Sequence, residues 1–116
     1  MLILIDQHCI PCDSKICLLT IEEARDMLRE VAGWEFKQDP YRIYKCFRFK
    51  NFYQTISFVN VVAWIANQEN HHPRLEVEYN RCMVEYWTHS INGLSENDFI
   101  CAAKINHLYS RWREIA

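Results

Sequence analysis

Glycine and proline are scarce in this chain of 116 residues, which has two of the first and three of the second. Such low counts exclude collagen-like and low-complexity architectures. Two glycines also cannot build the glycine-rich loops that hold phosphates, and neither G-x-x-x-x-G-K-[ST] nor G-x-G-x-x-G occurs. The G-x-S-x-G elbow of many serine hydrolases is absent as well. The sequence therefore points away from nucleotide-binding folds and from this class of hydrolase.

An excess of charge of one sign is also lacking, with 13 Lys+Arg against 15 Asp+Glu and a formal net charge of −2. Without a basic surplus to bind a phosphate backbone, we expect no nucleic-acid partner. The most apolar stretch, Ile56 to Ala66, is about half the roughly 20 residues of a membrane span. The first residues carry no basic segment typical of a signal peptide. We therefore expect a cytoplasmic protein without a membrane partner.

What the sequence does have is apolar material, because half of its residues are hydrophobic and 14% are aromatic. This length and composition fit one globular domain, which we place at residues 20–116. Residues 1–19 show no clear period, and we expect a loosely ordered N-terminal segment there.

Six cysteines are present, and in a reducing compartment they are most simply free thiols. Two other interpretations stay open for the N-terminal group. His8, Cys9, Cys12 and Cys17 could together hold a zinc ion, although no second C-x-x-C exists. A redox role for Cys9 and Cys12 would normally need a C-x-x-C that opens a helix after a strand, and that context is missing.

Hydrophobic periodicity and turn signals predict three helices and four strands. The capping-box spacing of Thr20 and Glu23 predicts a helix over 21–32 that stops at Gly33. A β-hairpin is expected over 34–49, with its turn at Asp39-Pro40. A second helix is predicted over 51–69, and the buried stripe expected on it is Phe52, Ile56, Val59, Ala63 and Ala66.

The second half of the chain predicts another pair of strands and a final helix. Residues 76–79 alternate, and so do residues 81–89, with Cys82, Val84 and Tyr86 on one face. Asn92-Gly93 predicts a turn, followed by a helix to about Arg113. The order α-β-β-α-β-β-α predicts an α+β fold, a four-stranded antiparallel sheet with helices packed on one face. Its unpaired sheet edges favour a homo-oligomer, a dimer or a tetramer.

The most unusual local feature is His71-His72-Pro73 after the second helix. Two imidazoles that titrate near neutral pH can serve acid–base chemistry, although they could equally be exposed loop side chains. A metal site would need a further ligand, and adjacent histidines have poor geometry for one ion.

Two further residues could take part in the same chemistry. His89 ends a predicted strand on the face of Trp87, so an aromatic wall could lie beside its ring. Asp98 lies near the start of the last helix, where it could cap the helix, orient a histidine, or do both.

Taken together, the run His71-His72-Pro73, five residues, Tyr79, nine residues, His89, eight residues, Asp98 resembles the signature of the pterin-4a-carbinolamine dehydratases. Gly33-Trp34, the stretch 47–52 and Thr88-His89-Ser90 are similar to the same family, and the similarity covers about residues 18–110. The N-terminal C-x-x-C resembles the bacterial branch. The resemblance implies an α+β fold and the removal of water from 4a-hydroxytetrahydropterin.

That reaction gives quinonoid dihydropterin and regenerates the pterin cofactor of an aromatic amino acid hydroxylase, such as phenylalanine hydroxylase, without metal or organic cofactor. By resemblance, His71 and His89 are the acid–base histidines, His72 positions the pterin and Asp98 orients His89. Asn70, Trp87 and Thr88 would border the ring.

One position departs from the family pattern. Many members carry a carboxylate four residues before the first histidine, where this chain has Asn67. Asparagine can bind the substrate by hydrogen bonds but cannot take up a proton. Glu69, about 200° further around the helix, is expected to be a poor substitute. The alternative function is a non-catalytic dimerisation or assembly module of the same fold.

Overall fold

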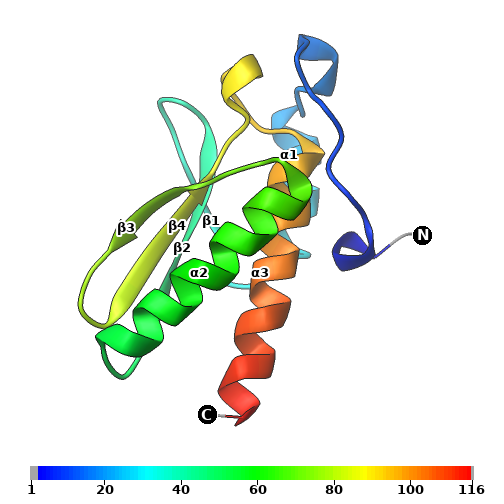
Figure 1. Cartoon of the computed structure of the whole chain (residues 1–116). Coiled ribbons are helices and arrows are strands. Elements are labelled where there is room, and N and C mark those ends of the chain that lie inside the picture. Colours follow the sequence, from blue (N-terminus) through cyan, green and yellow to red (C-terminus); the bar gives the residue numbers. More distant parts are fainter. Residues whose placement is uncertain (1–2, 116) are drawn as a thin grey trace.

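The computed structural model describes residues 3–115 and contains the elements that the sequence predicts, in the same order (Figure 1). The helices and strands are α1 (Ile21–Leu28), β1 (Glu35–Lys37), β2 (Arg42–Arg48), α2 (Phe52–Glu69), β3 (Arg74–Val77), β4 (Arg81–Tyr86) and α3 (Glu96–Ile115). Three short 3₁₀ helices, η1 (Leu4–Asp6), η2 (Lys15–Cys17) and η3 (His89–Ile91), lie in the connecting segments.

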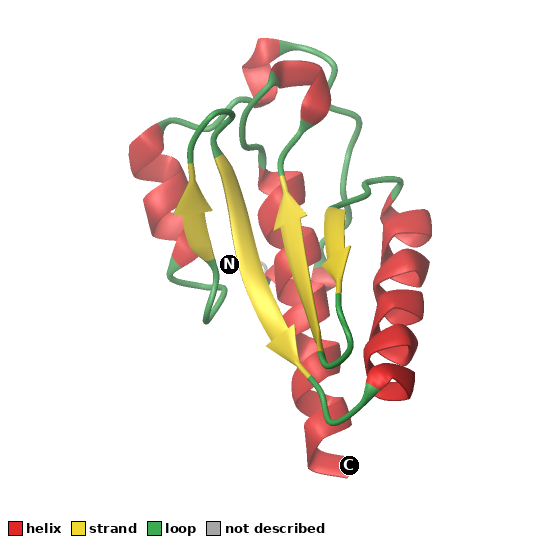
Figure 2. Cartoon of the chain, turned by 90° about the vertical axis from the view of Figure 1, so that its left-hand side faces the viewer, coloured by secondary structure: helices red, strands yellow, loops and turns green. Residues whose placement is uncertain are grey.

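The four strands form one antiparallel sheet in the order β1-β2-β4-β3. Figure 2 shows the sheet facing the viewer with the helices packed on one side of it. The predicted face of β4 is confirmed, because Cys82, Val84 and Tyr86 are all fully buried. This is the α+β architecture that the sequence predicts.

Local capping signals explain where α1 begins and ends. The Thr20 hydroxyl accepts from the Glu23 N–H (3.1 Å), and the Glu23 carboxylate accepts from the Thr20 N–H (2.9 Å), so the capping box is confirmed. The helix ends at Leu28, earlier than predicted, and a turn leads to Gly33, whose φ of +84° suits glycine.

The buried stripe of α2 differs from the prediction. Phe52 and Ala63 are exposed, whereas the buried residues are Thr55, Phe58, Val62, Ile65 and Glu69. The expected stripe was wrong because α2 is apolar around most of its circumference, so apolar spacing alone does not select the buried face. Thr55 is tolerated in the core because its hydroxyl is within 3.0 Å of both the Asn51 and the Tyr79 carbonyl oxygens.

The N-terminal segment, residues 3–19, is packed against the domain. Leu4 is buried in the core, and the Lys104 ammonium donates to the Ile5 carbonyl (2.8 Å). The Leu19 N–H donates to the Leu94 carbonyl (2.9 Å). These contacts are more specific than the loose order that the sequence suggests, and they bring the segment beside α3. Within residues 3–115, no helix combines the length and apolar character that crossing a bilayer requires.

Candidate active site

The two adjacent histidines lie where α2 ends and the chain turns toward β3. Asn70 takes the left-handed conformation (φ 51°) and ends the helix, and the His71 N–H donates to the Ala66 carbonyl (3.1 Å). Asparagine tolerates this conformation better than most residues. The bend lets both imidazoles line the same cavity, as the sequence required for a shared site.

That cavity has a volume of about 340 Å³, within the range of small-molecule sites. It lies at the end of the sheet where α2 finishes, β4 ends and α3 begins. All three histidines of the sequence hypothesis line it, together with Asn70 and Thr88. The full lining is Cys9, Ile10, Pro11, Cys12, Asp13, Glu69, Asn70, His71, His72, Thr88, His89, Ser90 and Asn97.

Asp98 orients His71, and not His89 as the resemblance implied. The His71 Nε2 lies 2.6 Å from Asp98 Oδ1, and the Asp98 side chain is fully buried. The expectation failed because the fold brings the end of α2 against the start of α3, so the imidazole that reaches Asp98 is that of His71. The His71 ring also stacks on Tyr86 at a centroid distance of 5.3 Å. A hydrogen bond and a packed aromatic face therefore fix this imidazole.

The second oxygen of Asp98 is held by the start of α3 and the residue before η3. Asp98 Oδ2 accepts from the Ser95 N–H (2.9 Å) and from the Thr88 hydroxyl (2.9 Å). The Thr88 and Ser95 hydroxyls are 2.7 Å apart, so Ser95 can donate to Thr88 while Thr88 donates to Asp98. Both carboxylate oxygens thus face donors, and a carboxylate at this position accepts a hydrogen bond from the N–H of the His71 tautomer protonated at Nε2.

His89 and His72 form the other part of the histidine group. Their ring centroids are 5.5 Å apart, and both side chains are exposed at the cavity. Trp87 stacks on His89 at 4.4 Å with nearly parallel planes. Trp87 is not among the described lining residues, so it supports the His89 ring from behind, whereas the sequence suggested a wall of the pocket itself.

The carboxylate residues in the lining of this pocket are Glu69 and Asp13, and Asn67 is not part of the lining. Asn67 is exposed on α2, whereas the Glu69 side chain is 4% exposed and lines the cavity. The sequence argument rejected Glu69 because it lies about 200° around the helix from position 67, where the family carboxylate was expected. The left-handed Asn70 reverses the chain, so Glu69 and His71 face the same space.

Three partners hold Glu69. Its Oε1 accepts from the Cys9 N–H (2.7 Å), and its Oε2 lies 2.9 Å from His8 Nδ1 and 3.8 Å from the Lys104 ammonium. Burial acts to raise the pKa of Glu69, but the Cys9 N–H, His8 and Lys104 outweigh it, and the net pKa lies below the ordinary value. The carboxylate is therefore charged near neutral pH.

The N-terminal cysteines lie beside the site as free thiols. Cys9 Sγ is 3.6 Å from Cys101 Sγ, and this contact, with burial, raises the pKa of the Cys9 thiol. Burial, with a contribution from Cys17, raises the pKa of Cys12 to about 11. Over residues 3–115, no group of three or more His, Cys, Asp or Glu side chains has the geometry to hold a metal ion. The structure thus does not assemble His8, Cys9, Cys12 and Cys17 as a group of metal ligands.

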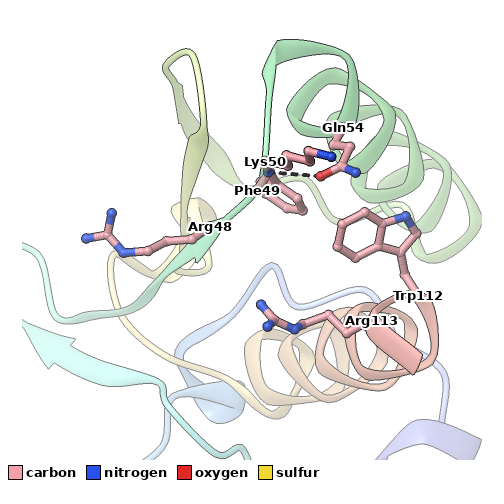
Figure 3. A pocket seen from close by; sticks show the side chains of 6 residues that line it. All are labelled: Arg48, Phe49, Lys50, Gln54, Trp112 and Arg113. Carbon is pink, nitrogen blue, oxygen red and sulfur yellow. Dashed lines mark hydrogen bonds between the residues drawn. The ribbon is translucent and has the colours of Figure 1, made fainter. Parts of the chain in front are cut away.

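A second pocket, of about 350 Å³, lies at the opposite end of the sheet, where Arg48 pairs with Arg81 (Figure 3). Its rings are Phe49 and Trp112, with centroids 5.5 Å apart. The other lining residues are Arg48, Lys50, Gln54 and Arg113. It offers neither an imidazole nor a carboxylate, so the histidine pocket is the candidate for proton-transfer chemistry.

Sequence reasoning missed Glu69, Ser90, Asn97 and the N-terminal residues as members of the site. Nothing in the sequence pattern indicated that Asn97 would reach Ile10. The N-terminal residues gave only the C-x-x-C, which indicates thiol chemistry and not a pocket wall.

Comparisons with known proteins agree on one family. The sequence model described as pterin 4 alpha carbinolamine dehydratase matches residues 18–108. A protein of Nitrosomonas eutropha is 52% identical over 106 residues, covering 90% of this chain and 92% of its own length. One of Legionella pneumophila (strain Corby) is 50% identical over 103 residues, covering 88% and 91%. Both are provisionally named pterin-4-alpha-carbinolamine dehydratases.

Two solved structures share the fold. The crystal structure of a transcriptional coactivator/pterin dehydratase from Brucella melitensis has a TM-score of 0.75 and 35% identity, over 78% of this chain and 97% of that one. A pterin dehydratase-like protein described as a RuBisCO assembly factor in the alpha-carboxysome has a TM-score of 0.58 and 19% identity, over 66% and 89%. The second likeness concerns the fold alone.

Proposed function

The chain belongs to the pterin-4a-carbinolamine dehydratase family, and we propose that it removes water from 4a-hydroxytetrahydropterin to give quinonoid dihydropterin. The observation that carries this proposal is the grouping of His71, His72 and His89 in one cavity, with the buried Asp98 bonded to His71. Three imidazoles around a space of about 340 Å³ suit a small planar substrate that must lose a hydroxyl group and a proton.

His71 has the surroundings of a general base. Asp98 accepts a hydrogen bond from the His71 Nε2–H, which leaves the Nδ1 lone pair free to take up a proton of the substrate. The same carboxylate stabilises the imidazolium that then forms. Asp98 acts through His71 and is therefore a positioning residue.

His89 is the complementary acid in this proposal. Stacked on Trp87 and exposed to the cavity, it can donate a proton to the 4a-hydroxyl, which leaves as water. The pterin nitrogen bonded to the 4a carbon supplies the electron pair that forms a C=N bond as the C–O bond breaks. The proton on this nitrogen passes to His71. His72, with Asn70 and Thr88, borders and positions the pterin. The reaction then needs no metal or organic cofactor.

The product determines the setting of the reaction. Quinonoid dihydropterin is the form that a reductase returns to tetrahydropterin, so the enzyme would recycle the cofactor of an aromatic amino acid hydroxylase such as phenylalanine hydroxylase. We place this activity in the cytoplasm, in a homo-oligomer.

The experiment generates 4a-hydroxytetrahydropterin in situ with a hydroxylase and follows its dehydration spectroscopically. We expect the wild type to accelerate the reaction, and His71→Ala and His89→Ala to lose most of that acceleration. His107→Ala is the matched control, because this exposed histidine on α3 is not among the lining residues of the pocket. A wild type no faster than buffer would overturn the proposal.

The second candidate is a dimerisation or assembly module. The observation in its favour is the exposed apolar surface of α2, which includes Phe52, Tyr53, Val61 and Trp64. The test is sedimentation of the wild type and Trp64→Glu, combined with the dehydration assay. An oligomer that dissociates in Trp64→Glu, from a wild type without activity, would favour the module. An active wild type favours the enzyme.

A further inference from the structure

The N-terminal segment contributes a continuous run of residues to the lining of the histidine pocket. Five consecutive residues, Cys9 to Asp13, line the cavity, and they lie in the connection between η1 and η2. We propose that residues 9–13 form a substrate-contacting wall, which binds the part of the pterin that does not react. This inference rests on the proposed function and adds a binding role to the segment.

Side chains of the catalytic region hold this wall at two points. Glu69 receives the Cys9 N–H at 2.7 Å. Asn97 pairs with both backbone groups of Ile10, because its Oδ1 accepts from the Ile10 N–H (3.1 Å) and its Nδ2 donates to the Ile10 carbonyl (2.6 Å). Both anchoring residues are buried, since the exposed fractions of the whole residues Glu69 and Asn97 are 8% and 4%.

These anchors bury the polar side chains of Glu69 and Asn97, which costs free energy unless the N-terminal segment is held in place to pair with them. A buried carboxylate and a buried amide need hydrogen-bond partners, and here the backbone of residues 9 and 10 supplies one for Glu69 Oε1 and one for each polar atom of the Asn97 amide. Ser90, beside His89, donates a further hydrogen bond to the Cys12 carbonyl. The wall is thus fixed to the same elements that carry His71 and His89.

The chemistry of the wall suits a flat heterocycle. Ile10 and Pro11 are apolar, and the raised pKa of Cys12, about 11, keeps its thiol neutral near physiological pH. The remaining lining residues include the three imidazoles. A planar pterin in the cavity would meet the apolar side chains of Ile10 and Pro11 in the wall and the proton-transfer groups of the remaining lining residues.

Asp13 is the one carboxylate among residues 9–13, and Ile10 has no acid–base group, so altering Ile10 should weaken binding and leave the chemical step unchanged. The informative change is Ile10→Asp, which places a charge at the wall. Its matched control is Ile16→Asp in the same segment. Both isoleucines are exposed, 65% and 91%, but Ile16 is not among the lining residues of this pocket.

For Ile10→Asp we expect KM to rise roughly tenfold with kcat unchanged, because the lost contacts are uniform binding. Ile16→Asp should behave as the wild type. Calorimetry with a 7,8-dihydropterin, which has the fused ring but no 4a-hydroxyl, should show the same weakening of Kd. If the wild type is active and Ile10→Asp has the same KM and Kd as Ile16→Asp, residues 9–13 do not contact the substrate. The proposed dehydratase activity would be unaffected by that result. A wild type that neither binds the dihydropterin nor accelerates dehydration would overturn both.

A second measurement detects contact directly in the unaltered chain. Saturating 7,8-dihydropterin should slow the alkylation of Cys12 several-fold, as followed by peptide mass mapping at mildly alkaline pH. Cys46, exposed on β2 and outside the pocket, is the internal control and should react at an unchanged rate. Equal alkylation of Cys12 with and without bound dihydropterin would contradict the proposal.

Discussion

Asp98 serves two structures at once. Its Oδ1 accepts a hydrogen bond from His71 Nε2, while its Oδ2 accepts one from the Ser95 N–H at the start of α3. The second contact is the carboxylate half of a capping box, and the first is the positioning of an imidazole. The sequence left both roles open for Asp98, and the structure shows that they coexist on different oxygens.

We predict that Asp98→Asn lowers kcat by about 10²-fold and the free energy of unfolding by about 1–3 kcal/mol. An amide cannot accept on both atoms, so its NH₂ group would oppose either His71 or the pair Ser95 and Thr88. Glu96→Gln, an exposed acidic residue in the same first turn, is the control and should change neither quantity.

The assay for this prediction is run below the melting temperature of every variant, with the pH dependence of kcat recorded. A positioning role predicts an altered pH profile, because the imidazolium of His71 loses its stabilising charge. An unchanged profile with lower stability would mean that Asp98 is only a helix cap.

The histidines could be predicted from the sequence because adjacent imidazoles, a proline and a strand-ending histidine are local signals. Their partners could not. Which histidine Asp98 reaches depends on how the end of α2 lies against α3, and that contact spans 27 residues of sequence. The left-handed Asn70, which redirects the chain so that His71 lines the same cavity as Glu69, is likewise a property of the folded backbone.

At the level of elements, α2 shows the limit of hydrophobic periodicity. Val61 and Val62 are neighbours in an apolar helix, yet their exposed fractions are 38% and 1%. The core side also accepts Thr55 and Glu69, whose polar groups find partners, and it leaves Trp64 outside. Strand β4 was easier to predict, because a period of two leaves only two faces to choose between.

We predict that Val62→Ala lowers the free energy of unfolding by about 2–3 kcal/mol, since it removes buried apolar surface and leaves a cavity. Val61→Ala, one residue away, should change it by less than about 0.5 kcal/mol. Urea unfolding of both variants at one protein concentration measures the difference. Equal losses would mean that the face of α2 is wrongly placed.

At the level of the whole molecule, Glu69 connects the two regions that the sequence analysis kept apart. It lies at the end of α2 and binds His8 and Cys9 of the N-terminal segment. The order of elements could be predicted without this connection. The packing of residues 3–19 could not, because the segment has no periodic pattern and its anchors are single side chains.

The lowered pKa of Glu69 predicts how stability depends on pH. Because the folded protein holds this carboxylate in its charged form, the contribution to stability is present above the ordinary glutamate pKa of 4.5. It is lost as the pH falls below that value and through the lower pKa of the folded state. We expect Glu69→Gln to be less stable than the wild type near neutral pH, and to lose less stability on acidification.

Urea titrations of both proteins near pH 7 and near pH 4 test this expectation. Glu22→Gln, an exposed glutamate in the first turn of α1, is the control and should follow the wild type at both pH values. A Glu69→Gln variant whose loss on acidification equals that of the wild type would show that the carboxylate is not held in its charged form.

The packing of residues 3–13 also has a practical consequence for handling the protein. An affinity tag fused to the amino end would be attached to the segment that lines the histidine pocket and could disturb its packing. The last helix, α3, ends at Ile115, far from that segment (Figure 1). A purification handle or an immobilisation linker therefore belongs at the carboxyl end.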